Sequence, residues 1–572
     1  MTTITANNNN NRISTTLTTN SGDNFALPSP VNNYEVLALD GNDTIDVGAG
    51  LLVTNSVFSG ADGNDSIVIG SGGAVNASLF GGAGNDTINT SAGSITDSLV
   101  QSLTGDNVFS IGASTLSFIQ TGSGADSISV GGASSFSTIA AGAGNDSIAL
   151  GAAAANNSTI YGGAGNDLIT GSGTMSLSLV QTNSGNNTIT LSGALTSSSV
   201  LTGFGTDTIT LSGALSKVLV AAKDSNDLIS LTGTVSSSTI YGGSGNDTIS
   251  LSNATITNSL FQSTSGNNSF VIANAAATAT NNTFTGGSGE DRVVFNGADL
   301  NLTTNNFFGL NNFNSIEKVE KAGTGVLTLG AFATLKGITD VVITGALNSG
   351  VDASAALQAL AITGNGVNNS IIGGAGNDTL SGGGGNDTIT GGAGIDTITG
   401  GTGADLLIAD NGNSDTFVFV TGDSFNRTAV AGSVATFGGG VDVITNFNLG
   451  GSATANFDSI RFNGTTYAGN TPAAFGANAS ITAGGVVQIN QGATALSAGL
   501  NNVYVRGATD GWNAASNTFT STTGTTSGAT GDVMLFQVLL TAPLAANTSL
   551  IISSQFSTAE AIILDNVTFL TA

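Results

Sequence analysis

Short runs of alternating apolar and polar residues, separated by glycine-rich turns, fill the first 300 residues of the chain. Within residues 162–179, one turn leads into Leu168-Ile169-Thr170, and a second leads into Met175-Ser-Leu177-Ser-Leu179. Alternation with a period of two is typical of strands that bury one face. The pattern predicts two short strands and two turns in each coil of a parallel β-solenoid.

The glycine-rich turns recur with a spacing close to twenty residues. Gly81-Gly-Ala-Gly-Asn-Asp86-Thr-Ile88 returns almost unchanged at residues 162–169 and 242–249. The looser copies have an acidic residue at the equivalent position: Asp43, Asp65, Asp126, Asp146, Asp207, Asp227 and Asp291. Four further turns have asparagine there: Asn24, Asn107, Asn187 and Asn268. The order of one Asn and then three Asp indicates tandem duplication of a four-coil unit, and random drift of Asp to Asn is the alternative.

These patterns divide the chain into four predicted regions of an all-β protein. Residues 1–300 are expected to form a long β-solenoid of about fourteen coils, and residues 301–365 a β-rich junction. Residues 366–420 contain four consecutive nonapeptides, beginning at Gly373, Gly382, Gly391 and Gly400, and should form a β-roll. Residues 421–572 are expected to form a β-rich C-terminal cap and secretion region.

Charge and composition exclude several classes of function. Ten Lys and Arg against 37 Asp and Glu give a net charge of −27, which argues against a nucleic-acid partner. The chain has no histidine and no cysteine, which excludes Ser-His-Asp and Cys-His catalysis, the usual zinc ligands and disulfides. No segment resembles a Sec signal, and none is apolar enough to span a membrane.

The turn Gly-Gly-x-Gly-x-Asp-x-apolar suits calcium for a physical reason. Glycine allows the positive φ angles that let backbone carbonyls converge, and calcium prefers six to eight hard oxygen ligands. The carboxylates predicted as calcium ligands are Asp43, Asp65, Asp86, Asp126, Asp146, Asp167, Asp207, Asp247, Asp291, Asp378, Asp387, Asp396 and Asp405. The glycines predicted to shape these sites are Gly81, Gly162, Gly242, Gly373, Gly382, Gly391 and Gly400. The alternative is a metal-free solenoid in which Asn and Asp only favour turns.

The nonapeptides from Gly373 to Ile408 resemble those of the repeats-in-toxin (RTX) family, whose members bind several Ca²⁺ ions. The resemblance implies a β-roll in which two nonapeptides form each coil, so Asp378 and Asp396 share one edge and Asp387 and Asp405 the other. It also implies secretion through a type I exporter, with folding triggered by extracellular calcium. The apolar tail 562–572 looks like an uncleaved secretion signal for that route, although an ordinary last strand explains it equally well.

Several turns depart from the RTX pattern. The turn 222–227 lacks all three glycines and has Lys223, which puts calcium at Asp227 in doubt. Asp40 and Asp62 are either additional ligands or surface charge. The Asn turns should bind weakly because an amide oxygen is neutral. Since the opposite turn of each long-solenoid coil lacks a carboxylate, the sequence predicts a single calcium row on one edge.

Three functions remain open. The first is a structural protein at the cell surface, such as an S-layer, sheath or filament subunit, resembling surface proteins of cyanobacteria and other Gram-negative bacteria and self-assembling into a homo-oligomer or polymer. The second is a calcium-dependent adhesin or matrix protein that binds glycans or lipopolysaccharide. The third is a polysaccharide-acting enzyme, for which the candidate carboxylates are Glu317, Glu320, Asp442 and Asp458. We expect the first, and hence no enzyme activity.

Overall fold

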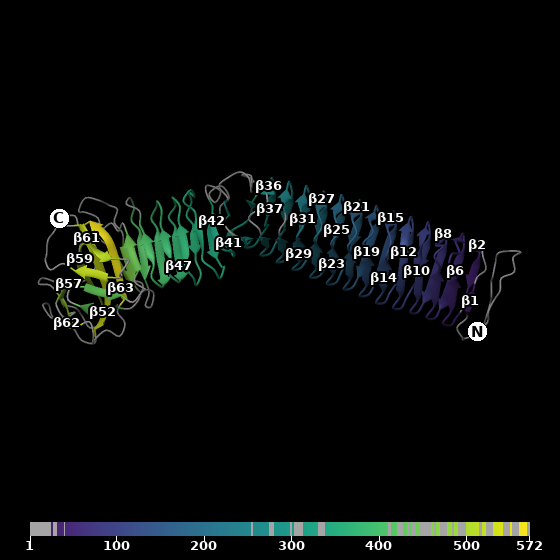
Figure 1. Ribbon diagram of the computed structural model, residues 1–572, viewed down its shortest axis with the longest axis horizontal. Coiled ribbons are helices and arrows are strands. Elements are labelled where there is room, and N and C mark those ends of the chain that lie inside the picture. Colours follow the sequence, from purple (N-terminus) through teal and green to yellow (C-terminus); the bar gives the residue numbers. More distant parts are fainter. Residues whose placement is uncertain are drawn as a thin grey trace. The chain divides into compact units, whose positions relative to one another are not determined.

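The computed structural model contains strands and turns throughout the residues that it describes (Figure 1). It describes residues 24–26, 31–38, 40–252, 255–273, 279–297, 300–301, 313–329, 338–409, 413–419, and the strands between 427 and 568. No helix in this part of the chain is long and apolar enough to cross a membrane. The chain divides into two compact units: residues 1–292 with 306–315 (unit 1), and residues 293–305 with 316–572 (unit 2).

Unit 1 is a parallel β-solenoid with three rows of strands. The row that follows the glycine-rich turns consists of β1 (Asn24–Ala26), β4 (Thr44–Val47), β7 (Ser66–Ile69), β10 (Thr87–Thr96), β12 (Val108–Thr115), β14 (Ser127–Val130), β17 (Ser147–Leu150), β20 (Leu168–Gly171), β23 (Thr188–Leu191), β26 (Thr208–Leu211), β29 (Leu228–Leu231), β32 (Thr248–Leu251) and β35 (Ser269–Ile272). The second row consists of β2 (Val31–Asn32), β5 (Val53–Thr54), β8 (Ala74–Val75), β15 (Ser134–Ser135), β18 (Ala155–Asn156), β21 (Met175–Ser176), β24 (Leu195–Thr196), β27 (Leu215–Ser216), β30 (Val235–Ser236), β33 (Ile256–Thr257) and β36 (Ala279–Thr280).

The third row is a 14-stranded parallel sheet that faces the first two rows across the core. It consists of β3 (Glu35–Leu37), β6 (Val57–Asp62), β9 (Ser78–Ala83), β11 (Leu99–Gln101), β13 (Phe118–Gln120), β16 (Thr138–Ala143), β19 (Thr159–Ala164), β22 (Leu179–Gln181), β25 (Ser199–Leu201), β28 (Leu219–Ala221), β31 (Thr239–Tyr241), β34 (Leu260–Gln262), β37 (Thr283–Thr285) and β40 (Phe313–Asn314). Its strands follow chain order, and each pairs with the next coil. The predicted solenoid is confirmed.

The number of strands in each coil differs from the prediction. The segment Met175–Leu179 is a bend and not one strand, because Leu177 has a φ of 54° and turns the chain between β21 and β22. Met175 is buried, Leu177 is 61% exposed, and the residue that enters the core after the bend is Val180. Each coil therefore has a corner that simple alternation does not reveal.

The core of unit 1 is thin and built from stacked identical rows. Ile189, Ile209 and Ile229 are all 0% exposed and pair in register from coil to coil. Towards the last coils of unit 1, aromatic rings replace the aliphatic side chains. The rings of Phe261 and Phe284 stack at 4.9 Å. Stacked rows of this kind fix the register, since a slip by one residue would expose the whole row.

Unit 2 continues with parallel coils of two rows. One row contains β38 (Arg292–Phe295), β41 (Lys318–Lys321), β43 (Asp340–Ile343), β45 (Ala361–Thr363), β47 (Thr379–Gly384), β49 (Thr397–Thr402), β51 (Thr416–Phe419) and β55 (Ser459–Phe462). β56 (Thr465–Ala468) pairs antiparallel with β55. The other contains β39 (Leu300–Asn301), β42 (Gly325–Thr328), β44 (Ser349–Asp352), β46 (Asn369–Ile372), β48 (Thr388–Thr390), β50 (Leu406–Ile408) and β54 (Asp442–Thr445).

The last strands of unit 2 pair mainly antiparallel. They are β52 (Arg427–Ala431), β53 (Val434–Phe437), β57 (Ala477–Thr482), β58 (Val486–Ile489), β59 (Gly499–Asn513), β60 (Thr518–Ser521), β61 (Thr530–Leu540), β62 (Ser549–Ile551) and β63 (Glu560–Thr568). β63 pairs in parallel with β54 of the solenoid and antiparallel with β61. Most of the proposed secretion tail therefore lies in a strand, and residues 569–572 lie outside the described residues. The four-region division of the chain stays a prediction.

Candidate metal centres

The glycine-rich turn at residues 162–167 shows how each candidate site is built. Gly163 and Gly165 have φ angles of 115° and 126°, which side chains other than glycine rarely adopt. A Cβ on Gly163 would lie 1.7 Å from the carbonyl oxygen of Gly142 in the preceding coil. Successive turns therefore stack backbone on backbone, with their carbonyl groups crowded along one edge.

The acidic residues at the ends of these turns form a continuous hydrogen-bonded ladder. The backbone N–H of Asp126 donates to Oδ1 of Asp146 at 2.8 Å, and that of Asp146 to Oδ1 of Asp167 at 3.2 Å. The same bond links each turn to the next one along the chain from Asp43 to Asp291. One carboxylate oxygen of each Asp is thus used to fasten neighbouring coils.

The second carboxylate oxygen, Oδ2, takes no part in this ladder. The Oδ2 atoms of Asp65, Asp146, Asp167, Asp227 and Asp387 are buried and accept no hydrogen bond. A buried charged oxygen without a partner is costly, so each of these atoms needs a compensating positive charge or a proton. Because the turns of unit 1 follow one another along the ladder, the spare oxygens of its aspartates form a row along that edge, hereafter called the file.

Burial of these carboxylates changes their acidity. Desolvation raises the pKa of Asp65 and Asp146 to about 7, against the opposing effect of a backbone hydrogen bond to each. The pKa of Asp227 rises to about 8, first by desolvation and then by the charges of Asp207 and Asp247. The Ser102 hydroxyl partly offsets the burial of Asp86, whose pKa is still raised. A divalent cation beside these oxygens would remove the penalty.

The glycine that opens each turn leaves room for the carboxylate that ends the same turn. A Cβ on Gly162 would lie 2.4 Å from Oδ2 of Asp167, and one on Gly382 would lie 2.1 Å from Oδ2 of Asp387. Among the described residues no three acidic side chains gather at one point, so backbone carbonyls must supply the other ligands. Hard oxygen ligands of this mixture fit Ca²⁺.

In the asparagine turns, the side-chain amide makes hydrogen bonds within the protein and needs no cation. Nδ2 of Asn107 donates to the carbonyl of Gly105 at 2.8 Å and to Oδ1 of Asp126 at 2.9 Å. Asn187 and Asn268 make the equivalent pairs of bonds. Asn24 does not belong to this set, because it pairs with Thr44 and lies one residue beyond the ladder position. The predicted first Asn turn is therefore wrong, since the sequence spacing does not fix the register at that end.

Two departures from the pattern are resolved by the structure. The turn 222–227 keeps its path without glycine: Ser225 takes a φ of 86°, and Asp227 remains buried in the ladder. Asp40 and Asp62 are exposed and lie outside the ladder, which favours surface charge over additional ligands. By its position in the ladder, Asp227 is a candidate calcium ligand like the other aspartates, although its turn lacks the glycines of the sequence motif.

Unit 2 has acidic ladders on both edges, as predicted. The N–H of Asp378 donates to Oδ1 of Asp396, and the N–H of Asp387 to Oδ1 of Asp405, each at 2.8 Å. The structure adds Asp415, which accepts from Asp396 at 2.9 Å.

The second addition is Asp442, which accepts from Asp405 at 2.8 Å. Asp442 was a candidate catalytic carboxylate, and the structure instead places it at the end of a ladder. Asp458 lies outside the described residues. Asp415 does not end a Gly-Gly-x-Gly-x-Asp turn. Asp442 follows three glycines, Gly438 to Gly440, but lies 37 residues after Asp405, so the nonapeptide spacing did not reveal it.

Two further ladders were also missed. The Asn at the fifth position of the turn bonds in the opposite direction, as in the N–H of Asn85 donating to Oδ1 of Asn64 at 2.8 Å. At the bend after the second row, buried serines take the role of the aspartates, as in the N–H of Ser158 donating to Oγ of Ser178 at 3.2 Å. The described turns therefore place carboxylates on one edge of unit 1 and hydroxyls at the bend.

The family comparison agrees with these turns. The model of the RTX calcium-binding nonapeptide repeat matches residues 71–94, 152–173, 230–253, 274–299, 363–398 and 381–414. A search of curated proteins found no match. The matched segments contain glycine-rich turns of both units. The chain is an RTX-type protein with calcium-binding repeats in a β-solenoid.

Proposed function

We propose that this RTX-type chain is a secreted structural protein that folds when it meets extracellular calcium and then assembles at the cell surface as an S-layer, sheath or filament. Calcium binds along one edge of unit 1 and both edges of the unit 2 coils. The protein has no catalytic role in this proposal. Secretion by a type I exporter is typical of proteins with these repeats.

The observation that carries the proposal is the file of buried, unpaired Oδ2 atoms. Carboxylates about 4.8 Å apart repel each other by roughly 1 kcal/mol even in water, and by more where water is excluded. Without a counter-ion the file opposes folding, and with calcium it holds neighbouring coils together. Calcium that binds only the folded chain adds stability by mass action.

Support for assembly comes from one corner of unit 1. Leu116, Phe136 and Leu177 are 59–61% exposed and have φ angles of 53–54°. Other coils place Asn or Ser at this corner, as at Asn157 and Ser197. A bulky apolar residue at positive φ costs stability and exposes apolar surface, so these three side chains suit contact with a second copy.

The test is a calcium titration of chelator-treated full-length protein, followed by circular dichroism and light scattering. We expect calcium to increase the β-structure and its resistance to urea, and then to cause growth of large ordered particles. Folding without growth would favour the adhesin alternative, which saccharide-dependent attachment would then examine. β-structure that is the same with and without calcium would contradict the proposal.

A further inference from the structure

Lys321 is completely buried in a coil whose described residues form no carboxylate ladder. Its side chain is 0% exposed, at the last position of β41 in unit 2. Lysine is almost never fully buried unless its ammonium is compensated. Nζ donates to the backbone carbonyl oxygens of Gly297 and Thr324, both at 2.5 Å.

The strand register places Lys321 in the row of the glycines that open the nonapeptides. Glu320 pairs with Val342, and the row continues through Thr363 and Ser381 to Thr399. The residues that follow these paired positions are therefore equivalent to one another. Lys321 follows Glu320, so it occupies the position that Gly382 and Gly400 occupy in later coils. A Cβ at those glycines would run into Oδ2 of Asp387 and of Asp405, at 2.1 and 2.2 Å.

The residue that ends the Lys321 turn also differs from the nonapeptide pattern. Gly325 pairs with Ser349, and Ser349 pairs with Asn369. The N–H of Asn369 donates to Oδ1 of Asp387, which places these residues in one ladder. The Lys321 coil thus has a glycine where the nonapeptide has its aspartate, and a cationic side chain where the nonapeptide has its glycine.

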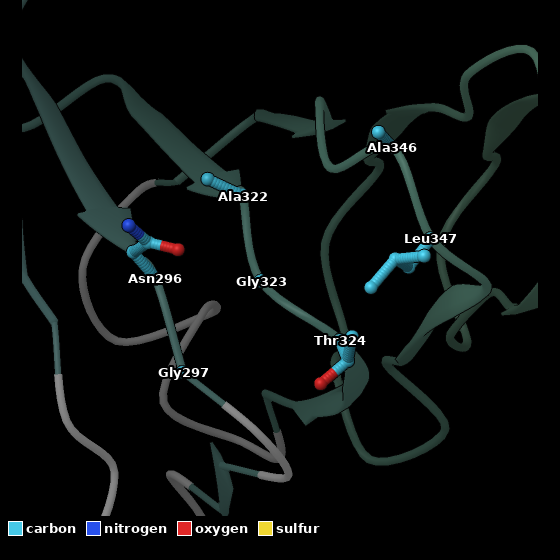
Figure 2. A pocket seen from close by; sticks show the side chains of 7 residues that line it. All are labelled: Asn296, Gly297, Ala322, Gly323, Thr324, Ala346 and Leu347. Carbon is cyan, nitrogen blue, oxygen red and sulfur yellow. The ribbon is translucent and has the colours of Figure 1, made fainter.

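The backbone around the ammonium is packed as in the metal turns. A Cβ on Gly323 would lie 2.4 Å from the carbonyl oxygen of Gly297. Figure 2 shows the residues that line a cavity here: Asn296 and Gly297, then Ala322 to Thr324, then Ala346 and Leu347. The cavity has a volume of about 400 Å³. Two of these turns supply the carbonyls that accept from Lys321.

We propose that the ammonium of Lys321 is a built-in substitute for calcium: it binds backbone carbonyls of two neighbouring turns and holds this coil together when calcium is absent. The proposal deepens the calcium-dependent function above and rests on it for the comparison with the nonapeptides. Its consequence is that unit 2 keeps an ordered, calcium-independent segment at residues 318–328, separated by the coils of β43 and β45 from the nonapeptide coils that need the ion.

Hydrogen exchange of the full-length protein in chelator and in calcium tests this directly. In chelator we expect residues 318–328 to stay protected while residues 378–408 lose protection. Lys321→Met should speed exchange of residues 318–328 in chelator by at least about tenfold, because it removes the two hydrogen bonds that tie the turns of Gly297 and Thr324 together. Lys318→Met, on the same strand but partly exposed, is the matched control and should leave the exchange unchanged.

A turn exchange separates a calcium substitute from an ordinary buried lysine. Residues 321–325 are replaced by Gly-Gly-Gly-Gly-Asn-Asp, the sequence of residues 382–387. We expect protection of this segment to become calcium-dependent and the number of bound calcium ions to rise by one. Loss of protection at 318–328 in wild-type protein in chelator, or an exchanged turn that binds no additional calcium, would overturn the proposal. A wild-type protein whose residues 378–408 ignore calcium would instead contradict the proposed function.

Discussion

The backbone N–H of Asp146 donates a hydrogen bond to Oδ1 of Asp167, one coil further along the chain, while Oδ2 of Asp167 is buried without a partner. The two carboxylate oxygens of Asp167 thus have separate roles. Oδ1 fastens the coils in any conditions, and Oδ2 is stabilised only by a proton or a cation. The following predictions depend on this division.

Asp167→Asn should keep the role of Oδ1 and remove that of Oδ2. The amide oxygen can still accept the hydrogen bond from Asp146, and the amide nitrogen can donate to Gly165, as Asn107 donates to Gly105. We expect the variant to be more stable than wild type in chelator by about 1–3 kcal/mol and to bind less calcium. Urea denaturation with and without calcium measures both effects. Asp40→Asn, at an exposed carboxylate, should change neither.

Asn187→Asp is the reverse experiment. It removes the amide donor to Gly185 and Asp207 and places a new spare oxygen in the file. We expect one more bound calcium ion and lower stability in chelator. Calcium stoichiometry by calorimetry is the measurement, and Asn186→Asp on the exposed ladder is the control. An unchanged stoichiometry would mean that the Asn coils lack some other ligand.

The stability of the metal-free protein should fall as pH rises. The buried carboxylates have folded pKa values raised to about 6–8, against 3.8 for the unperturbed group. The folded state therefore holds protons that the unfolded state has already released, which favours folding at low pH. In chelator we expect the urea midpoint to decrease from about pH 4 to about pH 8. Saturating calcium should abolish this trend, and a midpoint that rises with pH in chelator would contradict the assignment.

Phe136→Ser should weaken assembly without weakening the fold. Serine occupies the same corner at Ser197 and Ser237, with φ near 49°, so the substitution removes apolar surface from a strained position. We expect the calcium-induced folding transition to be unchanged or slightly easier, and the growth in light scattering to be reduced. Ser197→Asn, at the same corner of another coil, is the control and should assemble as wild type does.

Most of the fold could be predicted from the sequence because the repeat is local. The twenty-residue spacing, the period-two alternation and the glycine-rich turns specify one coil, and stacked coils follow from it. The resemblance to the RTX family also implied the correct edges for Asp378 and Asp387. It missed the bend at Leu177, because a leucine at positive φ leaves no signature in a hydrophobic pattern.

By itself, the sequence determined the chemistry of this protein: carboxylates in glycine-rich turns, no histidine or cysteine, and a repeating coil. Only the tertiary structure decided which atoms meet. The bond from Asp405 to Asp442 spans 37 residues, and the place of Lys321 among the glycines depends on the pairing of β41 with β43. Partners across coils are set by register and by loops of unequal length, and no spacing within a single repeat contains that information.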